Sequence, residues 1–238
     1  MTIIRNVQRA GRPKSEEKRQ LILDAATALF LEKGLQGASM DAVAREAGVS
    51  KQTVYSHFQN KDALYSACIK VKVASYGFDE SGFSEVGEPC ETLFVLVKRF
   101  MALIFDPEVV AMHRIVMAEA ASHPRIASLF YESGPGATHA AVEAFLQRLV
   151  EQGALRVHDT RYAANQLLNM AFGHFNLQLQ FGLIQQVPEV ELDAHLRRVV
   201  EDFWVLYGSP PPHAATAGRS SRPRATASPL FTPSSWKP

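Results

Sequence analysis

The chain has 238 residues, of which 47% are hydrophobic, so it can bury a core and is not disordered as a whole. Its formal net charge of +1 conceals an uneven distribution. Residues 1–70 carry 11 Lys and Arg against 7 Asp and Glu, residues 71–208 carry 10 against 17, and residues 209–238 carry 4 against 0. A basic N-terminal part on an acidic body favours binding of a polyanion, although charge alone also fits a solvated asymmetry without a partner.

Several protein classes are excluded by what the sequence lacks. The longest apolar runs are interrupted at Lys98 and Arg99, well short of the roughly 20 residues that a membrane helix needs. The N-terminus has no apolar stretch typical of a secretory signal, so we expect a cytoplasmic protein. Cys68 and Cys90 form no CxxC pair and the 8 histidines form no HxxxH pair. We therefore expect no disulfide framework, metal site or cofactor.

Helical periodicity, interrupted by Gly, Pro and capping residues, predicts helices along the chain and no strand. The first helix is expected to begin with Ser15 as its N-cap and to end at Lys33, before Gly34. The predicted helices are 15–33, 39–46, 50–57, 60–75, 89–105, 107–122, 124–132, 137–152, 159–183 and 188–207. The prolines that fit first-turn positions are Pro89, Pro107, Pro124 and Pro188.

Changes in composition divide the chain into four parts. Residues 1–14 are expected to form a basic flexible arm, 15–75 an N-terminal helical domain and 76–208 a larger helical domain, which begins with a glycine-containing linker. Residues 209–238 contain seven prolines and no acidic residue, which predicts a disordered basic tail. The tail could attract DNA weakly or be an inert extension.

Residues 39–61 have the spacing of two short helices that cross at a tight turn. Ser39 can cap the first helix, and Gly48 gives the backbone the freedom that the turn needs. Val54 and Phe58 of the second helix lie four residues apart, so both can be buried on one face. The remaining side chains of the second helix are therefore expected to face outward.

A short helix with a polar outer face fits the major groove of DNA, where each base pair presents a distinct hydrogen-bonding pattern. The candidates for base contacts are Lys51, Gln52 and Tyr55, and those for phosphate contacts are Thr53, Ser56 and His57, with Ser39 as a further DNA contact. The alternative is an amphipathic helix whose outer face is merely soluble.

Two more basic residues are candidates for DNA contacts outside this helix. Lys61 follows the Asn60 cap at the positive end of the next helix, where a bound phosphate would make a lysine favourable, although Asp62 could also neutralise this end. Arg12, in the sequence Gly-Arg-Pro, could enter the narrow minor groove of DNA beside the predicted helix 50–57. A solvated tail explains Arg12 equally well.

Residues 42–65, AVAREAGVSKQTVYSHFQNKDALY, resemble the DNA-binding domain of the TetR family, and the resemblance covers residues 15 to about 65. Residues 112–136 and 153–167 are similar, more loosely, to the C-terminal domain of the AefR-like subgroup. The resemblance implies an all-helical homodimer, usually a repressor, that a small molecule releases from its operator. It also implies phosphate contacts by residues at three matching positions, Tyr55, His57 and Lys61.

The expected fold is therefore all-α, with an N-terminal three-helix DNA-binding domain and a larger C-terminal helical domain for ligand binding and dimerisation. An apolar stripe on the last helix is wide enough to form a dimer interface with helix 159–183, or it is wholly internal core. The stripe comprises Leu192, Leu196, Val199, Phe203 and Leu206, with Val200, Trp204 and Tyr207 beside it. The candidate interface residues among these are Leu192, Leu196, Val199, Phe203 and Trp204. Candidates for binding a largely hydrophobic effector, each of which also fits plain core, are Phe94, Met101, His113, Met117, Phe172, His174 and Phe175.

Two other functions compete with a ligand-responsive regulator. A helical enzyme would need a nucleophile beside a base, a phosphate loop or a metal cluster, and the sequence presents none of these, so we expect no enzyme activity. An architectural DNA binder would keep the N-terminal domain and need no ligand. Release of operator DNA by a small molecule distinguishes the sensor from the architectural binder.

Overall fold

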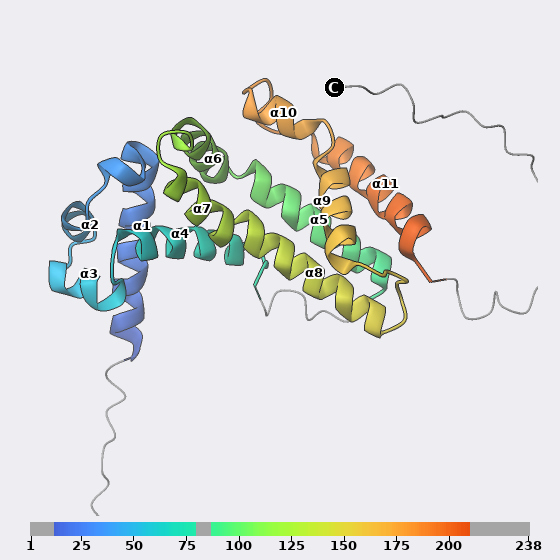
Figure 1. The fold of residues 1–238 in the computed structure, drawn as a ribbon, viewed down its shortest axis with the longest axis horizontal. Helices are drawn as coiled ribbons and strands as arrows, with labels where there is room; N and C mark the ends of the chain where they lie inside the picture. The colour runs from blue at the N-terminus through green and yellow to red at the C-terminus, as the bar shows by residue number, and fades with distance from the viewer. Residues whose placement is uncertain (1–11, 80–86, 210–238) are drawn as a thin grey trace, which may run out of the picture.

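The computed structural model describes residues 12–79 and 87–209, and within these ranges the chain is helical and contains no strand (Figure 1). The all-α prediction is therefore confirmed. The helices are α1 (Arg12–Gly37), α2 (Met40–Glu46), α3 (Lys51–His57), α4 (Lys61–Ser75), α5 (Pro89–Phe105), α6 (Pro107–Glu119), α7 (Pro124–Ser133), α8 (Pro135–Glu151), α9 (Thr160–Phe172), α10 (Phe175–Gln180) and α11 (Glu189–Tyr207). None of the described helices is long and apolar enough to cross a bilayer.

Several helix boundaries differ from those expected, and α1 continues past Lys33 to Gly37 with a non-helical residue at Gly34. Helix α1 begins at Arg12, so Ser15 lies inside the helix and its predicted capping role was wrong. The predicted helix 159–183 is divided at Gly173, where φ is 48° and ψ is −143°, a conformation that glycine adopts far more easily than other residues. Pro188 is the N-cap of α11 rather than a first-turn residue. The predicted arm 1–14 was wrong for residues 12–14, which belong to α1. Residues 1–11 of the arm, 80–86 of the predicted linker and the tail beyond residue 209 lie outside the described residues.

Helices α1, α2, α3 and the first half of α4 form the N-terminal domain, at the left of Figure 1. The core of this domain contains Ile22, Phe30 and Val54, each of which is fully buried. Phe30 also packs edge-to-face on Tyr65 of α4, with 5.2 Å between the ring centroids. These contacts fix the orientation of the α2–α3 pair on α1 and α4.

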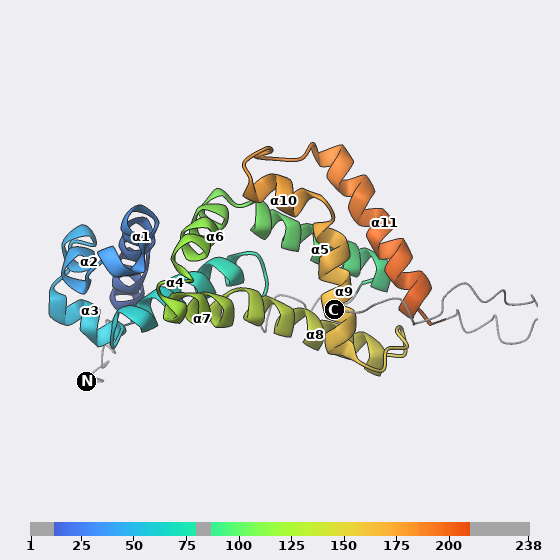
Figure 2. The ribbon, with the colours of Figure 1, turned by 45° about the horizontal axis from the view of Figure 1, so that its top comes forward.

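Helix α4 continues from the N-terminal domain into the body, where it packs against α7 (Figure 2). In the body, α8 packs along α9, and α11 covers α5 and α9. Buried side chains form one continuous core from Ile22 of α1 to Phe203 of α11. A displacement of α4 relative to the body would therefore also move the α2–α3 pair.

The apolar stripe predicted as a dimer interface is largely used inside the chain. Leu196 and Phe203 are fully buried, and Val199 is 4% exposed, because this face of α11 packs on α5 and α9. The prediction that these three residues contact a second subunit was wrong, and the alternative of internal core applies to them. Leu192 and Trp204 are partly exposed, so a partner contact by these two stays a prediction.

Candidate nucleic-acid interface and effector cavity

Local hydrogen bonds build the α2–α3 unit in the way that its sequence predicts. The hydroxyl of Ser39 accepts a hydrogen bond from the backbone N–H of Ala42 at 3.2 Å, and that of Ser50 accepts one from Thr53 at 3.1 Å. Each hydroxyl thereby satisfies a free amide at the start of a short helix. Gly48 has a φ of +64° in the turn between them, a value that a side chain would oppose.

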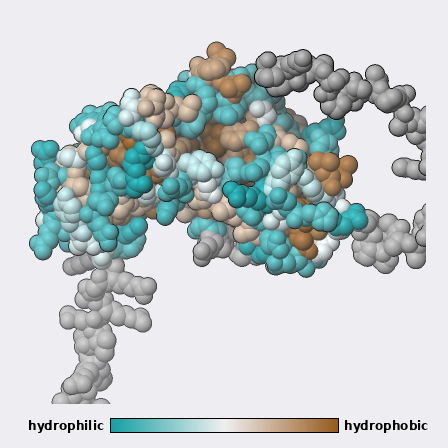
Figure 3. Space-filling view, in the orientation of Figure 1, coloured by the Kyte–Doolittle hydropathy of each residue, from teal (hydrophilic) through white to brown (hydrophobic). Residues whose placement is uncertain are grey.

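The outer face of α3 is polar and open to solvent. Gln52, Ser56 and Lys51 are exposed, and Tyr55 keeps 45% of its surface accessible. Thr53 and His57 are half-buried at the sides of the helix, whereas Val54 is fully buried. In Figure 3 the end of the molecule formed by α2 and α3 is mostly hydrophilic. The outward placement follows the prediction, and the DNA contacts themselves stay a prediction.

Some of these side chains already have partners within the chain. The Lys51 ammonium lies 2.7 Å from a carboxylate oxygen of Asp41 on α2, and this contact raises the pKa of Lys51. The Ser56 hydroxyl donates to the Thr53 carbonyl at 2.7 Å. A phosphate can accept a hydrogen bond from Ser56 only if the hydroxyl first leaves that carbonyl. The sequence pattern did not reveal either partner.

Lys61 ties the start of α4 to the end of α1. Its ammonium donates to the backbone carbonyls of Ala38 at 3.0 Å and Gln36 at 3.3 Å. An ammonium has three N–H donors, so one remains for a phosphate. Arg12 is the first residue of α1, and its minor-groove contact stays a prediction.

Four of the residues predicted to contact DNA surround one hollow beside α3. The hollow has a volume of about 390 Å³. Ser39, Lys51, Tyr55 and Lys61 line it together with Asp41, their neighbour on α2. Residues from α2, α3 and α4 therefore converge on a surface that is mostly open to solvent.

A second, larger cavity of about 750 Å³ lies between the N-terminal domain and the body. Its wall includes residues of α1 and α4 as well as residues of α5, α6, α8 and α10. Of the predicted ligand-binding residues, His113 and Phe172 line this cavity. Side chains from both parts of the molecule thus share one ligand-sized space.

The other residues predicted to bind a ligand do not line this cavity, and their contact with a ligand stays a prediction. Phe94, Met101 and Phe175 are buried in the core away from the cavity, whereas Met117 is 68% exposed and His174 is also exposed. Bulky apolar residues on a helix fit either core or cavity wall, and only the packing of neighbouring helices distinguishes the two.

Two hydrogen-bonded pairs of polar side chains contribute to the cavity wall. His113 Nδ1 lies 2.9 Å from the amide oxygen of Gln180, and His139 Nδ1 lies 2.7 Å from that of Asn165. His139 and Gln180 line the cavity but were missed from the sequence. The polar His139 within an otherwise apolar stretch of α8 was the signal that could have indicated it.

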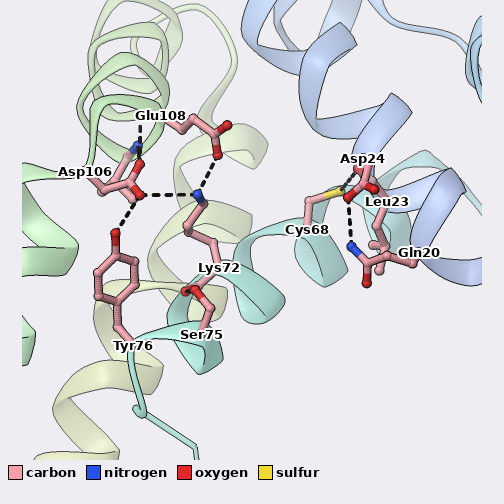
Figure 4. Close-up of polar contacts among 10 residues, drawn as sticks. Gln20, Leu23, Asp24, Cys68, Lys72, Ser75, Tyr76, Asp106 and Glu108 are labelled. Carbon is pink, nitrogen blue, oxygen red and sulfur yellow. Dashed lines mark hydrogen bonds and ion pairs between the residues drawn. The ribbon is translucent and has the colours of Figure 1, made fainter.

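A charged cluster joins α4 to the start of α6 at one side of the cavity (Figure 4). The Lys72 ammonium lies 2.5 Å from Glu108 and 3.3 Å from Asp106. Tyr76 donates to the same Asp106 carboxylate at 2.7 Å, and this carboxylate also caps α6 by accepting from the amides of Glu108 and Val109. Asp106 therefore connects the α6 N-terminus with two side chains from the end of α4 and the residue after it.

Two ionisable groups near the cavity have pKa values that differ from their ordinary ones. Burial raises the pKa of Asp106, but hydrogen bonds from Tyr76 and Val109 and the charge of Lys72 outweigh burial, so the pKa lies below its ordinary value. Burial raises the pKa of the Cys68 thiol to about 11. Cys68 is therefore protonated near neutral pH and unsuited to redox sensing.

Comparisons with known proteins agree with this architecture. Residues 22–68 match the profile of the bacterial regulatory proteins of the tetR family, and residues 91–209 match that of the AefR-like transcriptional repressor C-terminal domain. The transposon Tn10 TetC protein from Escherichia coli is 27% identical over 160 residues, which cover 65% of this chain and 76% of TetC. A match to the transcriptional activator FasR of Mycolicibacterium smegmatis is 40% identical but covers 26% of this chain and 29% of FasR.

Two solved structures resemble nearly the whole described fold. A TetR-family regulator from Mesorhizobium loti has 29% sequence identity and a TM-score of 0.68, covering 83% of this chain and all of its own. The flavonoid-responsive regulator FrrA has 31% identity and a TM-score of 0.65, covering 84% of this chain and all of its own. The helix-turn-helix, the helical body and these matches together show that the chain is a TetR-family transcriptional regulator with an AefR-like C-terminal domain.

Proposed function

We propose that this regulator is a repressor that binds a palindromic operator as a homodimer and is released by a small molecule. The observation that carries the proposal is the position of the 750 Å³ cavity, whose wall includes α1 and α4 of the N-terminal domain and α6 of the body. A ligand in this space contacts the helices that orient α3. Ligand binding and DNA binding are then coupled through α4, and each weakens the other.

In the DNA complex, α3 lies in the major groove. Lys51, Gln52 and Tyr55 contact base edges, which requires Lys51 to exchange its Asp41 partner for DNA. The phosphate contacts are assigned to Thr53, Ser56, His57 and Lys61, with Ser39 and Arg12 as further contacts. Two α3 helices in a symmetric dimer would meet the groove about 34 Å apart, which is one turn of DNA.

Exposed apolar side chains on α10 and α11 support the proposal that a second subunit packs against this part of the body. Leu177 is 64% exposed and Phe181 73% exposed, at and just after α10, while Val205 is 84% and Leu206 62% exposed on α11. Figure 3 shows hydrophobic side chains at the tip formed by α10 and beside α11. Burial of such residues against a second copy stabilises a dimer, and Leu192 and Trp204 would lie at its edge.

The effector is a small organic molecule with a largely apolar body, and the chain acts by binding rather than by catalysis. The relative FrrA is described as flavonoid-responsive, and the relatives FasR, SrpR and AcrR are described as transcriptional regulators. Among the lining residues are Phe100, Met112, Phe130 and Phe172, which provide a broad apolar wall. We place this activity in the cytoplasm, where chromosomal DNA is accessible.

Replacing Tyr55 with Ala tests the assignment of α3. The purified full chain is titrated onto duplexes from its own promoter region at low salt. The Tyr55→Ala variant should bind at least about fivefold more weakly, since one good base contact is worth about 1–3 kcal/mol. Tyr131→Ala is the matched control, because Tyr131 is 61% exposed on α7 in the body. Equal operator affinity of the Tyr55 variant and the wild type would remove α3 from the interface.

A further inference from the structure

The cavity has very little positive charge to offer a ligand. Lys72 is the sole Lys or Arg among the described residues that line it. The Lys72 ammonium is already held between Glu108, at 2.5 Å, and Asp106, at 3.3 Å (Figure 4). Asp24 of α1 lines the cavity as well. Three carboxylates, those of Asp24, Asp106 and Glu108, therefore lie at or beside the cavity against one ammonium, and a ligand carboxylate would be repelled.

The cavity wall also offers hydrogen-bonding side chains. His113 and His139 line the cavity, and each places Nδ1 against an amide oxygen, so Nδ1 is the donor in that contact and Nε2 is left for another partner. The side-chain amide of Asn176 also lines the wall. These groups can pair with ligand hydroxyls without any change of charge, while the aromatic and aliphatic residues around them favour an apolar body.

We infer that this cavity selects neutral, largely apolar molecules that carry hydroxyl groups and discriminates against amphiphiles with a carboxylate. The inference rests on the proposed function, since it names the ligand class of the proposed effector site. The pairing of Lys72 with Glu108 and Asp106 is what denies a carboxylate its cationic partner. A substitution that weakens this ion pairing should allow a ligand with a carboxylate to bind in the cavity.

Two probes of equal chain length separate charge from apolar size. 1-Decanol and decanoate are titrated by calorimetry into the wild-type full chain and into Glu108→Gln, which removes the negative charge from the shorter of the two Lys72 contacts. Glu91→Gln is the control, because Glu91 pairs with Arg197 on the surface and does not line the cavity. In the wild type and the control, decanol should bind at least about tenfold more tightly than decanoate. In Glu108→Gln, decanoate affinity should rise about tenfold while decanol affinity stays unchanged.

Three results would overturn the inference. Decanoate could bind the wild type as tightly as decanol, or the ratio could be the same in Glu108→Gln as in Glu91→Gln, or decanol could fail to bind. The operator titration is performed on the same proteins without either probe. If the wild type does not bind the operator, the proposed function is contradicted. If the wild type binds the operator but the ratio of decanol to decanoate affinity differs from the expected one, only the inferred ligand class is contradicted.

Discussion

Replacing Lys61 with Met separates two roles of one ammonium group, because Met keeps the aliphatic stem and removes the charge. In the structure this ammonium donates to the carbonyls of Ala38 and Gln36, and in the proposed complex it also contacts a phosphate. The first role affects folding stability and the second affects DNA binding. The two roles give signatures that can be measured independently.

The expected magnitudes follow from these contacts. A net contribution of about 1.5–3 kcal/mol is usual for a hydrogen bond from a charged group, and partial exposure of Lys61 reduces it, so we expect the free energy of unfolding to fall by about 1–2 kcal/mol in total. Loss of one phosphate contact per subunit should reduce the slope of log affinity against log salt by about 0.9, and therefore by about 1.8 for a dimer.

The assay is a salt titration of operator affinity, combined with urea unfolding of the same protein. Arg156→Met is the control, since it removes one exposed positive charge from the loop after α8, far from α3. We expect this control to leave the salt slope unchanged. A lower affinity of Lys61→Met with a wild-type slope would refute the phosphate contact and leave Lys61 as a support for the α1–α2 turn.

Three further predictions concern the body of the protein. Phe181→Asp should make the protein monomeric in sedimentation experiments at micromolar concentration. Met117→Asp, at a comparably exposed apolar position on α6, should leave the dimer intact, and a dimeric Phe181 variant would contradict the proposed interface. Cys68 should resist a thiol reagent at pH 8 in the folded protein and react in denaturant, because burial raises its pKa to about 11, and rapid modification of the native thiol would contradict this. The pKa of Asp106 is lower in the folded protein than its ordinary value of 3.8, so the ionised carboxylate stabilises the fold above pH 3.8, and this stabilisation is lost as the pH falls through the folded-state pKa. In urea unfolding, Asp106→Asn should therefore lower the free energy of unfolding at pH 7 and lower it progressively less below pH 3.8. A difference between variant and wild type that does not change with pH would refute the reasoning.

The N-terminal domain was predictable because its determinants are local. Ser39, Gly48 and Ser50 act within a few residues of themselves, and the spacing of Val54 and Phe58 identifies the buried face without knowledge of any other helix. The outward orientation of the α3 side chains follows directly. The partners of Lys51 and Lys61 could not be predicted, because they depend on how α2 and α1 pack beside α3 and α4.

The helices of the body were predictable from the sequence, but which of their faces form the core, the cavity wall or a partner contact was much less so. The same apolar arc on α11 suits a partner subunit or its own core, and the arrangement of α5 and α9 decides for core at Leu196 and Phe203. The cavity presents the same ambiguity: His113 and Phe172 line it, while Met101 packs away from it. The Lys72–Asp106 pair joins residues 34 positions apart, a distance that no local pattern encodes.

The central claim is that the α3 helices of two subunits occupy the major groove of one operator. Methylation-protection footprinting on DNA from the protein's own promoter region tests it most directly, because guanine N7 lies in the major groove. We predict two protected patches whose centres lie about 34 Å, or one helical turn, apart. Saturating protein at low ionic strength that leaves every major-groove guanine reactive would contradict the claim.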